Sequence, residues 1–467
     1  MSSTTTSNML VSRKPINFLR GWPAPELLPA QLLSSACQRV LSNQAEYTEY
    51  LEYGADEGLT RLRSGLAKWL GAHYKVKPDL ERICITGGAS QNLACILQSF
   101  SDVNFTRAVW IVAPCYHLAS PIFEDAGFAG RLKAVPEDEE GIDLAVFEEK
   151  LKRFEEEDQQ GHQEKPFKCF GTDRKLYRHL IYCVPTCSNP SGKTMSLRRR
   201  EALVKLARKY DALIISDDVY DFLQWPLQGP VSAERLPSMS MPRICDIDLA
   251  MGNSENDPLG FGHAVSNGSF SKISGPGVRT GWAEASPAFI TGLAHTAATR
   301  SGGAPSQLCA SMLAELVETG KLQEYIEETL RPAMQRRHRL LIDAVRTHLA
   351  PLGVSTRASS MEGSESFGGY FVWLDFPKEF SADLIASVAK EEDNLILGYG
   401  NMFVVKGDES GARFNHSIRL CFAWEAEEDL VDGVKRLGLL ISRMRKNKEH
   451  YLKLAEAGAL ADMSKDV

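Results

Sequence analysis

The sequence lacks the cysteine patterns that mark disulfide frameworks, redox centres and zinc sites. Its ten cysteines include no Cys-x-x-Cys pair, and together with the ten histidines they show no zinc-ligand spacing. Several of them, such as Cys84, Cys183 and Cys421, lie inside apolar runs, where free cysteine behaves as a small hydrophobic residue. We therefore expect no bound metal and a reducing compartment.

Long apolar stretches and a strong charge of either sign are also absent. No run approaches the roughly 20 apolar residues of a membrane-spanning helix, and Met1–Lys14 has no apolar signal core. The net charge of −7 over 467 residues, without clustered lysine and arginine, argues against nucleic-acid binding. We expect a cytoplasmic protein with no membrane or nucleic-acid partner; an atypical organelle signal stays an alternative.

What the sequence does contain is an alternation of short apolar runs and helical patterns. Strands are predicted at Ile83–Thr86, Val109–Ala113, Leu180–Val184, Ala212–Ser216, Ala264–Phe270, Gly368–Leu374 and Ile418–Phe422. Helices are predicted at Leu59–Tyr74, Ser90–Phe100, Leu197–Tyr210, Leu308–Leu316 and Leu322–Leu349. This alternation is typical of an α/β domain whose mainly parallel sheet is covered on both faces. In such folds the functional groups follow the carboxyl ends of the strands.

The chain is predicted to divide into three parts. These are an N-terminal arm and helix (1–50), a large domain (51–306) and a smaller α+β C-terminal domain (307–467). Two polar segments, near 156–178 and 226–262, interrupt the pattern and are predicted to be insertions. Neither contains a recognisable catalytic motif.

Two strand ends carry residues suited to a phosphate and to a planar ring. The turn that contains Ala89 and Ser90 joins a strand to a helix, and backbone N–H groups at a helix start bind anions. A plain helix cap by Ser90 explains the same residues. Tyr116 follows the next strand, where it is either a stacking face for a ring or an ordinary core tyrosine.

Two further strand ends supply an amide and a carboxylate. Asn189 lies in an Asn-Pro-Ser-Gly turn, where its amide either donates to a ring oxygen or closes an Asx-turn. Asp217 ends a buried strand, so its carboxylate needs a cationic partner unless it caps a helix. A protonated pyridine nitrogen is such a partner, and Tyr220 lies close enough in sequence to reach a hydroxyl of the same ring.

The stretch Ser269–Trp282 carries a single lysine among small residues. Lys272 is an ordinary solvated residue if its loop is considered alone, but an environment that lowers its pKa would make it a nucleophile. Together the phosphate turn, aromatic, amide, carboxylate and lysine come in order at successive strand ends. They are the groups that pyridoxal 5′-phosphate (PLP) requires: an imine-forming lysine, a carboxylate for the pyridinium and a phosphate site.

On these motifs, residues 16–445 resemble the class I/II aminotransferases of PLP fold type I, in particular the 2-aminoadipate/kynurenine aminotransferase-like subgroup. The resemblance implies a seven-stranded, mainly parallel sheet in the large domain, a PLP cofactor and a homodimer. It implies that Lys272 forms the Schiff base with PLP, that Asp217 contacts the ring nitrogen and that Tyr220 contacts the ring hydroxyl.

The resemblance also implies the remaining site residues. For the cofactor they are Ala89, Ser90, Tyr116, Asn189, Ser269, Ser271 and Arg279, with Tyr53 reaching the phosphate of the neighbouring subunit. For the substrate they are Arg419, which would grip the α-carboxylate, and Asn189, Gly21 and Arg20. The turn departs from the family pattern, because Ala89-Ser90-Gln91 stands where Ser-Gln-Gln or Ala-Gln-Gln is common. We therefore expect backbone contacts to the phosphate there.

The function implied is transfer of an amino group between an L-amino acid and a 2-oxo acid by a ping-pong mechanism. The donors that we consider are 2-aminoadipate, glutamate and aromatic amino acids. Arg20 and Trp22 lie in an arm that often borders the substrate side chain in this family, and a cation there favours acidic donors unless it is solvated or paired structurally. A PLP-dependent lyase or synthase is the main alternative. A non-catalytic PLP-binding regulator is the second, although the resemblance begins by residue 16 and leaves no room for a preceding winged-helix module.

Overall fold

The structure is a computed structural model that describes residues 13–158, 165–169, 171–227, 241–356 and 366–456. Its centre is an eight-stranded sheet. In spatial order the strands are β2 (Ile83–Thr86), β10 (Gly281–Glu284), β9 (Ala264–Ser269), β7 (Ala212–Asp217), β6 (His179–Cys183), β3 (Ala108–Ala113), β4 (Leu132–Asp138) and β5 (Gly141–Ile142). Neighbours are parallel from β9 to β4, whereas β10 and the two-residue β5 run antiparallel to the strands beside them.

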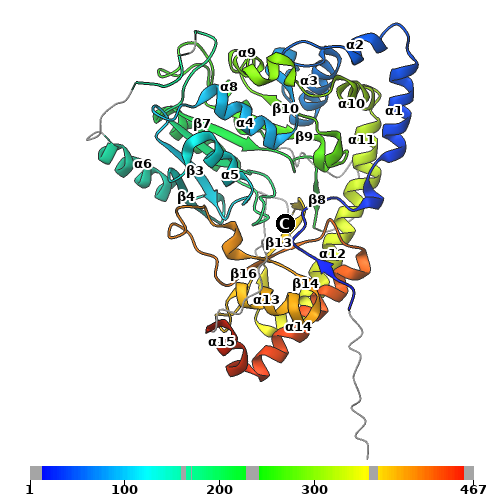
Figure 1. The fold of residues 1–467 in the computed structure, drawn as a ribbon, viewed down its shortest axis with the longest axis vertical. Helices are drawn as coiled ribbons and strands as arrows, with labels where there is room; N and C mark the ends of the chain where they lie inside the picture. The colour runs from blue at the N-terminus through cyan, green and yellow to red at the C-terminus, as the bar shows by residue number, and fades with distance from the viewer. Residues whose placement is uncertain (1–12, 159–164, 170, 228–240, 357–365, 457–467) are drawn as a thin grey trace, which may run out of the picture.

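Helices cover both faces of this sheet, as the alternation predicts (Figure 1). One face packs against α4 (Ala89–Phe100), α5 (Ala119–Phe123) and α9 (Pro287–Ala294), and the other against α6 (Leu144–Asp158), α7 (Leu197–Lys209) and α8 (Ile244–Ala250). Successive strand residues point to opposite faces: Ile214 belongs to the core beneath α7, whereas Ile215 belongs to the core beneath α4. The strands are therefore apolar on both sides, and only their ends are free to carry chemistry.

The periodicity missed three strands of the sheet, β4, β10 and the two-residue β5. The sequence of β4 ends in Pro136, Glu137 and Asp138, so it does not form an uninterrupted apolar run. The four residues of β10, Gly281–Glu284, end in an acidic residue that is buried against Arg243. The predicted number of seven strands came from the family resemblance. The eighth strand is β5, which forms a short hairpin with β4 at the edge of the sheet.

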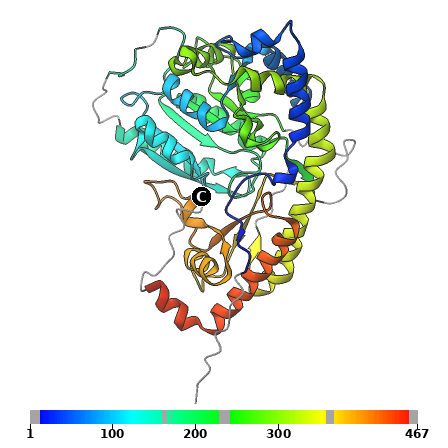
Figure 2. The same cartoon turned by 45° about the vertical axis from the view of Figure 1, so that its right-hand side comes forward.

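A layer of helices flanks the β2 edge and includes α1 (Ala30–Ser42), α2 (Tyr47–Leu51), α3 (Thr60–Tyr74) and α10 (Gln307–Glu318). Helix α10 packs against α1 and α3. A longer helical path then follows through α11 (Lys321–Tyr325), a π-helical turn (Ile326–Leu330) and α12 (Arg331–His348). In Figures 1 and 2 this path runs from the upper part of the molecule down to the C-terminal part. The division at residues 50/51 and 306/307 stays a prediction.

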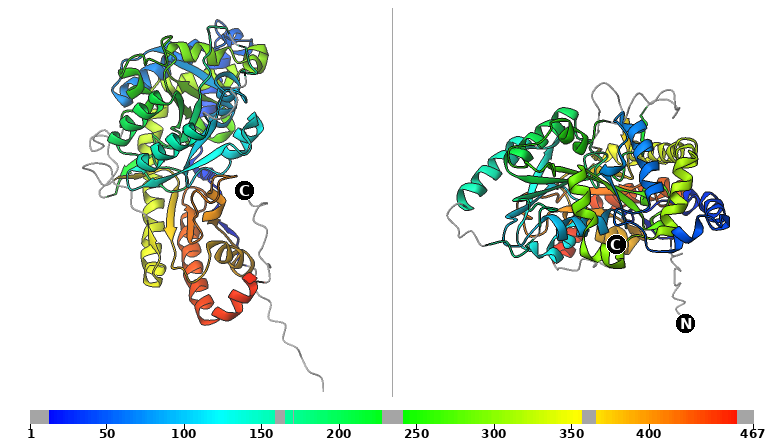
Figure 3. Two further views of the ribbon diagram at one scale, coloured as in Figure 1. Left: turned by 90° about the vertical axis from the view of Figure 1, so that its left-hand side faces the viewer. Right: turned by 90° about the horizontal axis from the view of Figure 1, so that it is seen from above.

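The C-terminal part is built on a four-stranded antiparallel sheet, which lies below the large sheet in the left view of Figure 3. Its strands are, in order, β11 (Ser355–Thr356), β13 (Phe371–Asp375), β16 (Ser417–Cys421) and β15 (Gly398–Tyr399). The helices α13 (Ala382–Asp393), α14 (Glu427–Lys446) and α15 (Lys448–Glu456) belong to the same part. The N-terminal arm joins it, because β1 (Ile16–Asn17) pairs in parallel with β14 (Leu395–Ile396).

The strand predicted at Gly368–Leu374 is divided in two. Gly369 has φ +69°, a left-handed conformation that glycine adopts without steric cost. The turn lets β12 (Ser366–Gly368) pair with β8 (Gln224–Pro226) while β13 joins the C-terminal sheet. Apolar character on both sides of the turn concealed it from the sequence pattern.

Parts of the two predicted insertions lie outside the described residues, namely 159–164, 170 and 228–240. Lys168, in the first, donates to the carbonyl oxygens of Leu97, Gln98 and Ser101 at the end of α4. The second includes α8, which packs against α7. Among the described helices none combines the length and apolarity that crossing a membrane requires.

Candidate active site

A cavity of about 250 Å³ opens at the carboxyl-end edge of the large sheet, between that sheet and the C-terminal part. Of the fourteen predicted site residues, thirteen line it and Tyr53 does not. The thirteen are Arg20, Gly21, Ala89, Ser90, Tyr116, Asn189, Asp217, Tyr220, Ser269, Ser271, Lys272, Arg279 and Arg419. The fold therefore brings together side chains that lie up to about 400 positions apart in the sequence.

Lys272 lies in the turn that follows β9, and its ammonium faces the cavity. Its Nζ donates to the carbonyl oxygen of Gly21 at 2.9 Å and lies 5.2 Å from the centre of the Tyr370 ring. Burial lowers the pKa of the Lys272 ammonium to about 8, although the carboxylate of Asp217 opposes this shift. A larger fraction of this amine is therefore neutral near pH 7 than for an exposed lysine.

Asp217 is the last residue of β7 and is buried at the floor of the cavity. Its Oδ2 accepts a hydrogen bond from the Tyr182 hydroxyl at 2.7 Å, whereas its Oδ1 is buried and has no hydrogen-bond partner among the described residues. Burial raises the pKa of this carboxyl to about 6, and the Tyr182 hydrogen bond and the charge of Lys272 act against the increase. An unpartnered buried carboxylate oxygen requires a donor, and a protonated pyridine nitrogen would supply it.

Arg419 enters the cavity from β16 of the C-terminal part and lies between aromatic rings and polar acceptors. Its Nη1 donates to Asn189 Oδ1 at 2.8 Å, and its Nη2 donates to the carbonyl oxygen of Leu19. Its guanidinium lies 4.0 Å from the centre of the Phe371 ring. Its Nε is buried without a partner among the described residues, and burial lowers the pKa of the group to about 10. A free donor on a buried cation is suited to a carboxylate.

The cavity is also lined by a group of residues suited to an anion. Helix α4 begins at Ala89 and Ser90, so its first N–H groups face the cavity. Arg279 lies beside them, with Nη2 donating to the Gly87 carbonyl oxygen at 2.9 Å and Nη1 3.5 Å from the Ser271 hydroxyl. Gly88 has φ +97°, a conformation that residues with a Cβ rarely adopt, so glycine is favoured there. Together a helix start, a cation and hydroxyl groups match a phosphate monoester.

The N-terminal arm forms the wall near the entrance. The guanidinium carbon of Arg20 lies 4.8 Å from the centre of the Trp22 ring and 5.0 Å from that of Trp424. Arg20 pairs with no carboxylate within ion-pair distance among the described residues. Gly21 fits closely, because a Cβ there would lie 2.7 Å from Phe371. The arm thus places a cation between two indole rings at the cavity wall.

The sequence patterns missed several residues that line this cavity or contact its side chains. Tyr182 and Phe371 contact the predicted groups, and His117 lines the wall beside Tyr116 with burial lowering its pKa to about 4. Tyr182 had a detectable signal, since it is one of two polar residues in the otherwise apolar β6 strand. Phe371 and His117 had none, because their positions depend on how the C-terminal part packs against the large sheet.

Tyr53 lies away from the cavity in this chain. Its side chain is 89% exposed, next to the segment Thr299–Gly303. The sequence resemblance assigns it to the neighbouring subunit's phosphate, and its exposure leaves it accessible to a second copy. That role stays a prediction.

The fold and the cavity define the class of protein: an α/β enzyme of PLP fold type I, with a lysine, a carboxylate and the start of a helix beside an arginine at the ends of its strands. Residues 27–437 match the family model "Aminotransferase class I and II". The chain therefore belongs to this family of PLP-dependent aminotransferases, as the motifs predicted.

Individual relatives agree with this assignment. The chain is 32% identical over 452 residues to the uncharacterized protein YER152C of Saccharomyces cerevisiae, covering 91% of this chain and 96% of the yeast protein. It is 28% identical over 432 residues to aromatic-amino-acid aminotransferase 1 of Thermococcus litoralis, covering 92% and 89%. The crystal structure of LysN, the alpha-aminoadipate aminotransferase of Thermus thermophilus complexed with N-(5′-phosphopyridoxyl)-L-leucine, matches with a TM-score of 0.70 and 26% identity, covering 92% and 93%.

Proposed function

We propose that this protein binds PLP in the cavity and transfers the amino group of an L-amino acid to a 2-oxo acid in two half-reactions with ping-pong kinetics. The observation that supports this most is the convergence of Lys272, Asp217 and Arg419 on one cavity. The Lys272 amine is hydrogen-bonded there only to a carbonyl oxygen, and Asp217 Oδ1 and Arg419 Nε have no hydrogen-bond partner among the described residues. The amine suits the Cα proton, the carboxylate oxygen suits the ring nitrogen of PLP, and the guanidinium suits the α-carboxylate of the amino acid. A binding module would need the cavity and the charges, but not a lysine whose pKa is lowered to about 8.

The residues that would hold PLP divide by the part of the cofactor they suit. Asp217 would hold the proton on the ring nitrogen, and Tyr116 would stack on the ring. Asn189 and Tyr220 would contact the ring hydroxyl oxygen. The phosphate would be held by the backbone N–H groups at Ala89 and Ser90, the hydroxyls of Ser269 and Ser271, the guanidinium of Arg279 and, in a homodimer, Tyr53 of the second copy.

Bound PLP draws electrons away from the amino-acid Cα and so makes its proton acidic. Lys272 would take that proton with its neutral amine and return it as a general acid. Arg419 would fix the α-carboxylate of the amino acid, using its unpartnered Nε. These two contacts would orient the Cα–H bond toward Lys272.

We propose that the donor carries an acidic or aromatic side chain, such as 2-aminoadipate, glutamate or an aromatic amino acid. Arg20 provides a cation without an ion-pair partner among the described residues, which suits a side-chain carboxylate, and the flanking Trp22 and Trp424 suit an aromatic ring. The names of the Thermococcus and Thermus relatives, an aromatic and an alpha-aminoadipate aminotransferase, support the same two classes.

A half-reaction screen tests the proposal. The protein loaded with PLP is mixed with one amino acid at a time, and the absorbance of the bound cofactor is followed without any 2-oxo acid. An aminotransferase releases one equivalent of 2-oxo acid per site and then stops until a 2-oxo acid is added. Continued product formation without a 2-oxo acid would show a lyase or synthase, and no reaction with any amino acid would favour a PLP-binding regulator.

A further inference from the structure

Tyr182 and Asp217 form a buried pair beneath the cavity. Tyr182 lies on β6 and Asp217 at the end of the neighbouring strand β7. Both side chains are buried, and the phenol donates to Asp217 Oδ2 at 2.7 Å. The other carboxylate oxygen, Oδ1, is left without a hydrogen bond from any described residue. One oxygen is therefore held by the protein and the other is available to a ligand.

The surroundings of Asp217 make this hydrogen bond important. Among the described residues, Tyr182 provides the one side-chain hydrogen bond to the carboxylate. The other titratable groups that influence it electrostatically are Lys272, Asp221, Tyr116, Tyr220 and Cys183, and the backbone N–H of Val219 also contributes. When its amine is neutral, Lys272 no longer stabilises the negative charge of Asp217. The Tyr182 hydrogen bond must then stabilise the ionised carboxylate without help from a charged lysine.

A tyrosine nearby shows what an ordinary core phenol does in this fold. Tyr177, just before the start of β6, is equally buried, and its hydroxyl donates to the backbone carbonyl oxygen of Gly262 at 2.5 Å. That partner carries no charge and does not line the candidate active-site cavity. Tyr182 has the same chemistry and the same burial, but its partner is a carboxylate that lines the active site.

We propose that Tyr182 is a positioning residue: its hydroxyl holds Oδ2 of Asp217, so that Oδ1 faces the cavity and the carboxylate stays ionised to bind a protonated pyridine nitrogen. This inference rests on the proposed function, because the nitrogen belongs to PLP. Loss of the phenol would make the carboxyl easier to protonate and free to rotate, and a protonated carboxyl cannot balance a pyridinium charge. The pair would therefore act through the ring nitrogen and through no other part of the cofactor.

Titration of the cofactor-free protein with PLP and with its analogue that has carbon in place of the ring nitrogen tests this role. Tyr182→Phe should weaken PLP binding about tenfold at pH 7, the effect of losing a hydrogen bond to a charged group. The loss should shrink as the pH rises above 8, since the carboxyl then ionises without the phenol. Binding of the carbon analogue should be the same in Tyr182→Phe and wild type.

Tyr177→Phe is the matched control, because it removes a buried phenol and a hydrogen bond of similar length. It should reduce the thermal unfolding midpoint and leave both binding constants at the wild-type value. If Tyr182→Phe behaves like Tyr177→Phe, or weakens both cofactors equally, Tyr182 is a core residue and the proposal is wrong. Wild-type protein that takes up neither cofactor would instead refute the proposed function.

A second substitution covers the case in which Tyr182→Phe does not fold. Placing 3,5-difluorotyrosine at position 182 preserves the shape and makes the phenol a stronger donor. It should retain tight PLP binding down to a lower pH than wild type does, without changing binding of the carbon analogue. An unchanged pH profile would contradict the proposal.

Discussion

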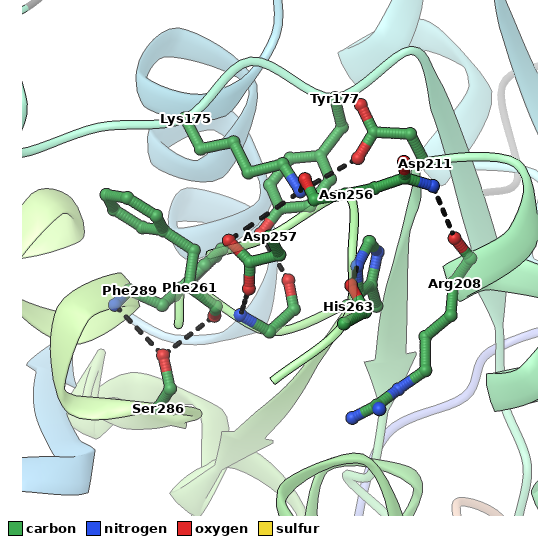
Figure 4. A network of polar contacts seen from close by, with 12 residues as sticks. Lys175, Tyr177, Arg208, Asp211, Asn256, Asp257, Phe261, His263, Ser286 and Phe289 are labelled. Carbon is green, nitrogen blue, oxygen red and sulfur yellow. Dashed lines mark hydrogen bonds and ion pairs between the residues drawn. The ribbon is translucent and has the colours of Figure 1, made fainter. Parts of the chain in front are cut away.

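Buried charges lie at both the amino ends and the carboxyl ends of the strands in the large sheet, but they are paired differently at the two ends. At the amino-end edge, Lys175 forms ion pairs with Asp211 at 2.8 Å and Asp257 at 3.7 Å, and its Nζ also donates to the Asn256 carbonyl oxygen (Figure 4). His263 is held by Ser254 and by the Ala212 carbonyl oxygen through its two ring nitrogens. Asp211 Oδ1 and Asp257 Oδ1 have no hydrogen bond among the described residues, but both lie within ion-pair distance of the Lys175 ammonium, so each of these charges faces an opposite charge within the chain.

At the carboxyl-end edge the partners are incomplete. Asp217 Oδ1 and Arg419 Nε have no hydrogen-bond partner among the described residues, and Lys272 makes its hydrogen bond to a carbonyl oxygen and not to a carboxylate. Burial of polar groups without full partners costs stability. One sheet thus carries a charge-paired network at the amino ends of its strands and a less completely satisfied one at their carboxyl ends, where we propose that PLP binds. Substitutions at matched positions of the two edges should separate stability from function.

The largest difference is expected between the two lysines. Lys272→Ala should reduce kcat by about 10⁴-fold, the upper range for loss of a general acid–base group, and should change the absorbance of bound PLP. Lys175→Ala should reduce the thermal unfolding midpoint and leave kcat within about twofold of wild type in a steady-state assay with saturating donor, because Lys175 does not line the cavity. Comparable turnover in the two variants would remove Lys272 from the mechanism.

A smaller loss is expected for the arginines. Arg419→Gln should reduce kcat/KM for every amino-acid donor about 100-fold, because charge-assisted hydrogen bonds to the carboxylate are lost, and most of the change should appear in KM. Arg208→Gln is the control at the amino ends of the strands. It breaks the 2.7 Å ion pair between Arg208 and Asp248 and should reduce stability without changing kcat/KM. Equal kcat/KM for Arg419→Gln and wild type in steady-state kinetics would contradict the carboxylate role.

The specificity of the arm is expected to change by about one order of magnitude. Arg20→Ala should reduce kcat/KM for dicarboxylic donors roughly tenfold, the effect of losing one hydrogen bond to a charged group, with little change for alanine as donor. Arg346→Ala, a substitution in an exposed i,i+3 ion pair, should change neither. An equal loss of kcat/KM for acidic and neutral donors would show that Arg20 supports the structure of the arm and does not recognise the substrate side chain.

The smallest effect concerns the stability of the cofactor-free protein. The pKa of Lys272 is about 8 when folded and returns toward 10.5 on unfolding, so the unfolded chain binds more protons between these values. Lys272→Met should therefore unfold a few °C higher than wild type at pH 7, with the advantage declining as the pH rises from 8 to 10.5. Thermal denaturation across that range measures it, and Lys175→Met should show the opposite sign. A pH-independent difference would mean that desolvation of Lys272 does not limit stability.

The sequence pattern predicts much of this molecule, and its failures have physical causes. Strand–helix alternation and the motifs around Asn189, Asp217 and Lys272 predicted the sheet, its class and the cavity residues, because strand-end positions in a parallel sheet converge on one edge. The divided strand around Gly369 and the strands β4 and β10 were missed, since turns and short or polar strands leave little periodic signal. Tyr182, His117 and Phe371 were missed because pairing and packing across segments brings them to the site.

By itself, then, the sequence determined the fold class, the family and the order of the chemical groups along the chain, because apolar periodicity and motif spacing are local. Only the tertiary structure decided which oxygen of Asp217 remains available, that Arg20 lies between Trp22 and Trp424, and that the charges of Lys175 are satisfied whereas those of the cavity are not. These properties depend on distances and burial between segments far apart in the chain. The hydrophobic periodicity of a single segment does not determine them.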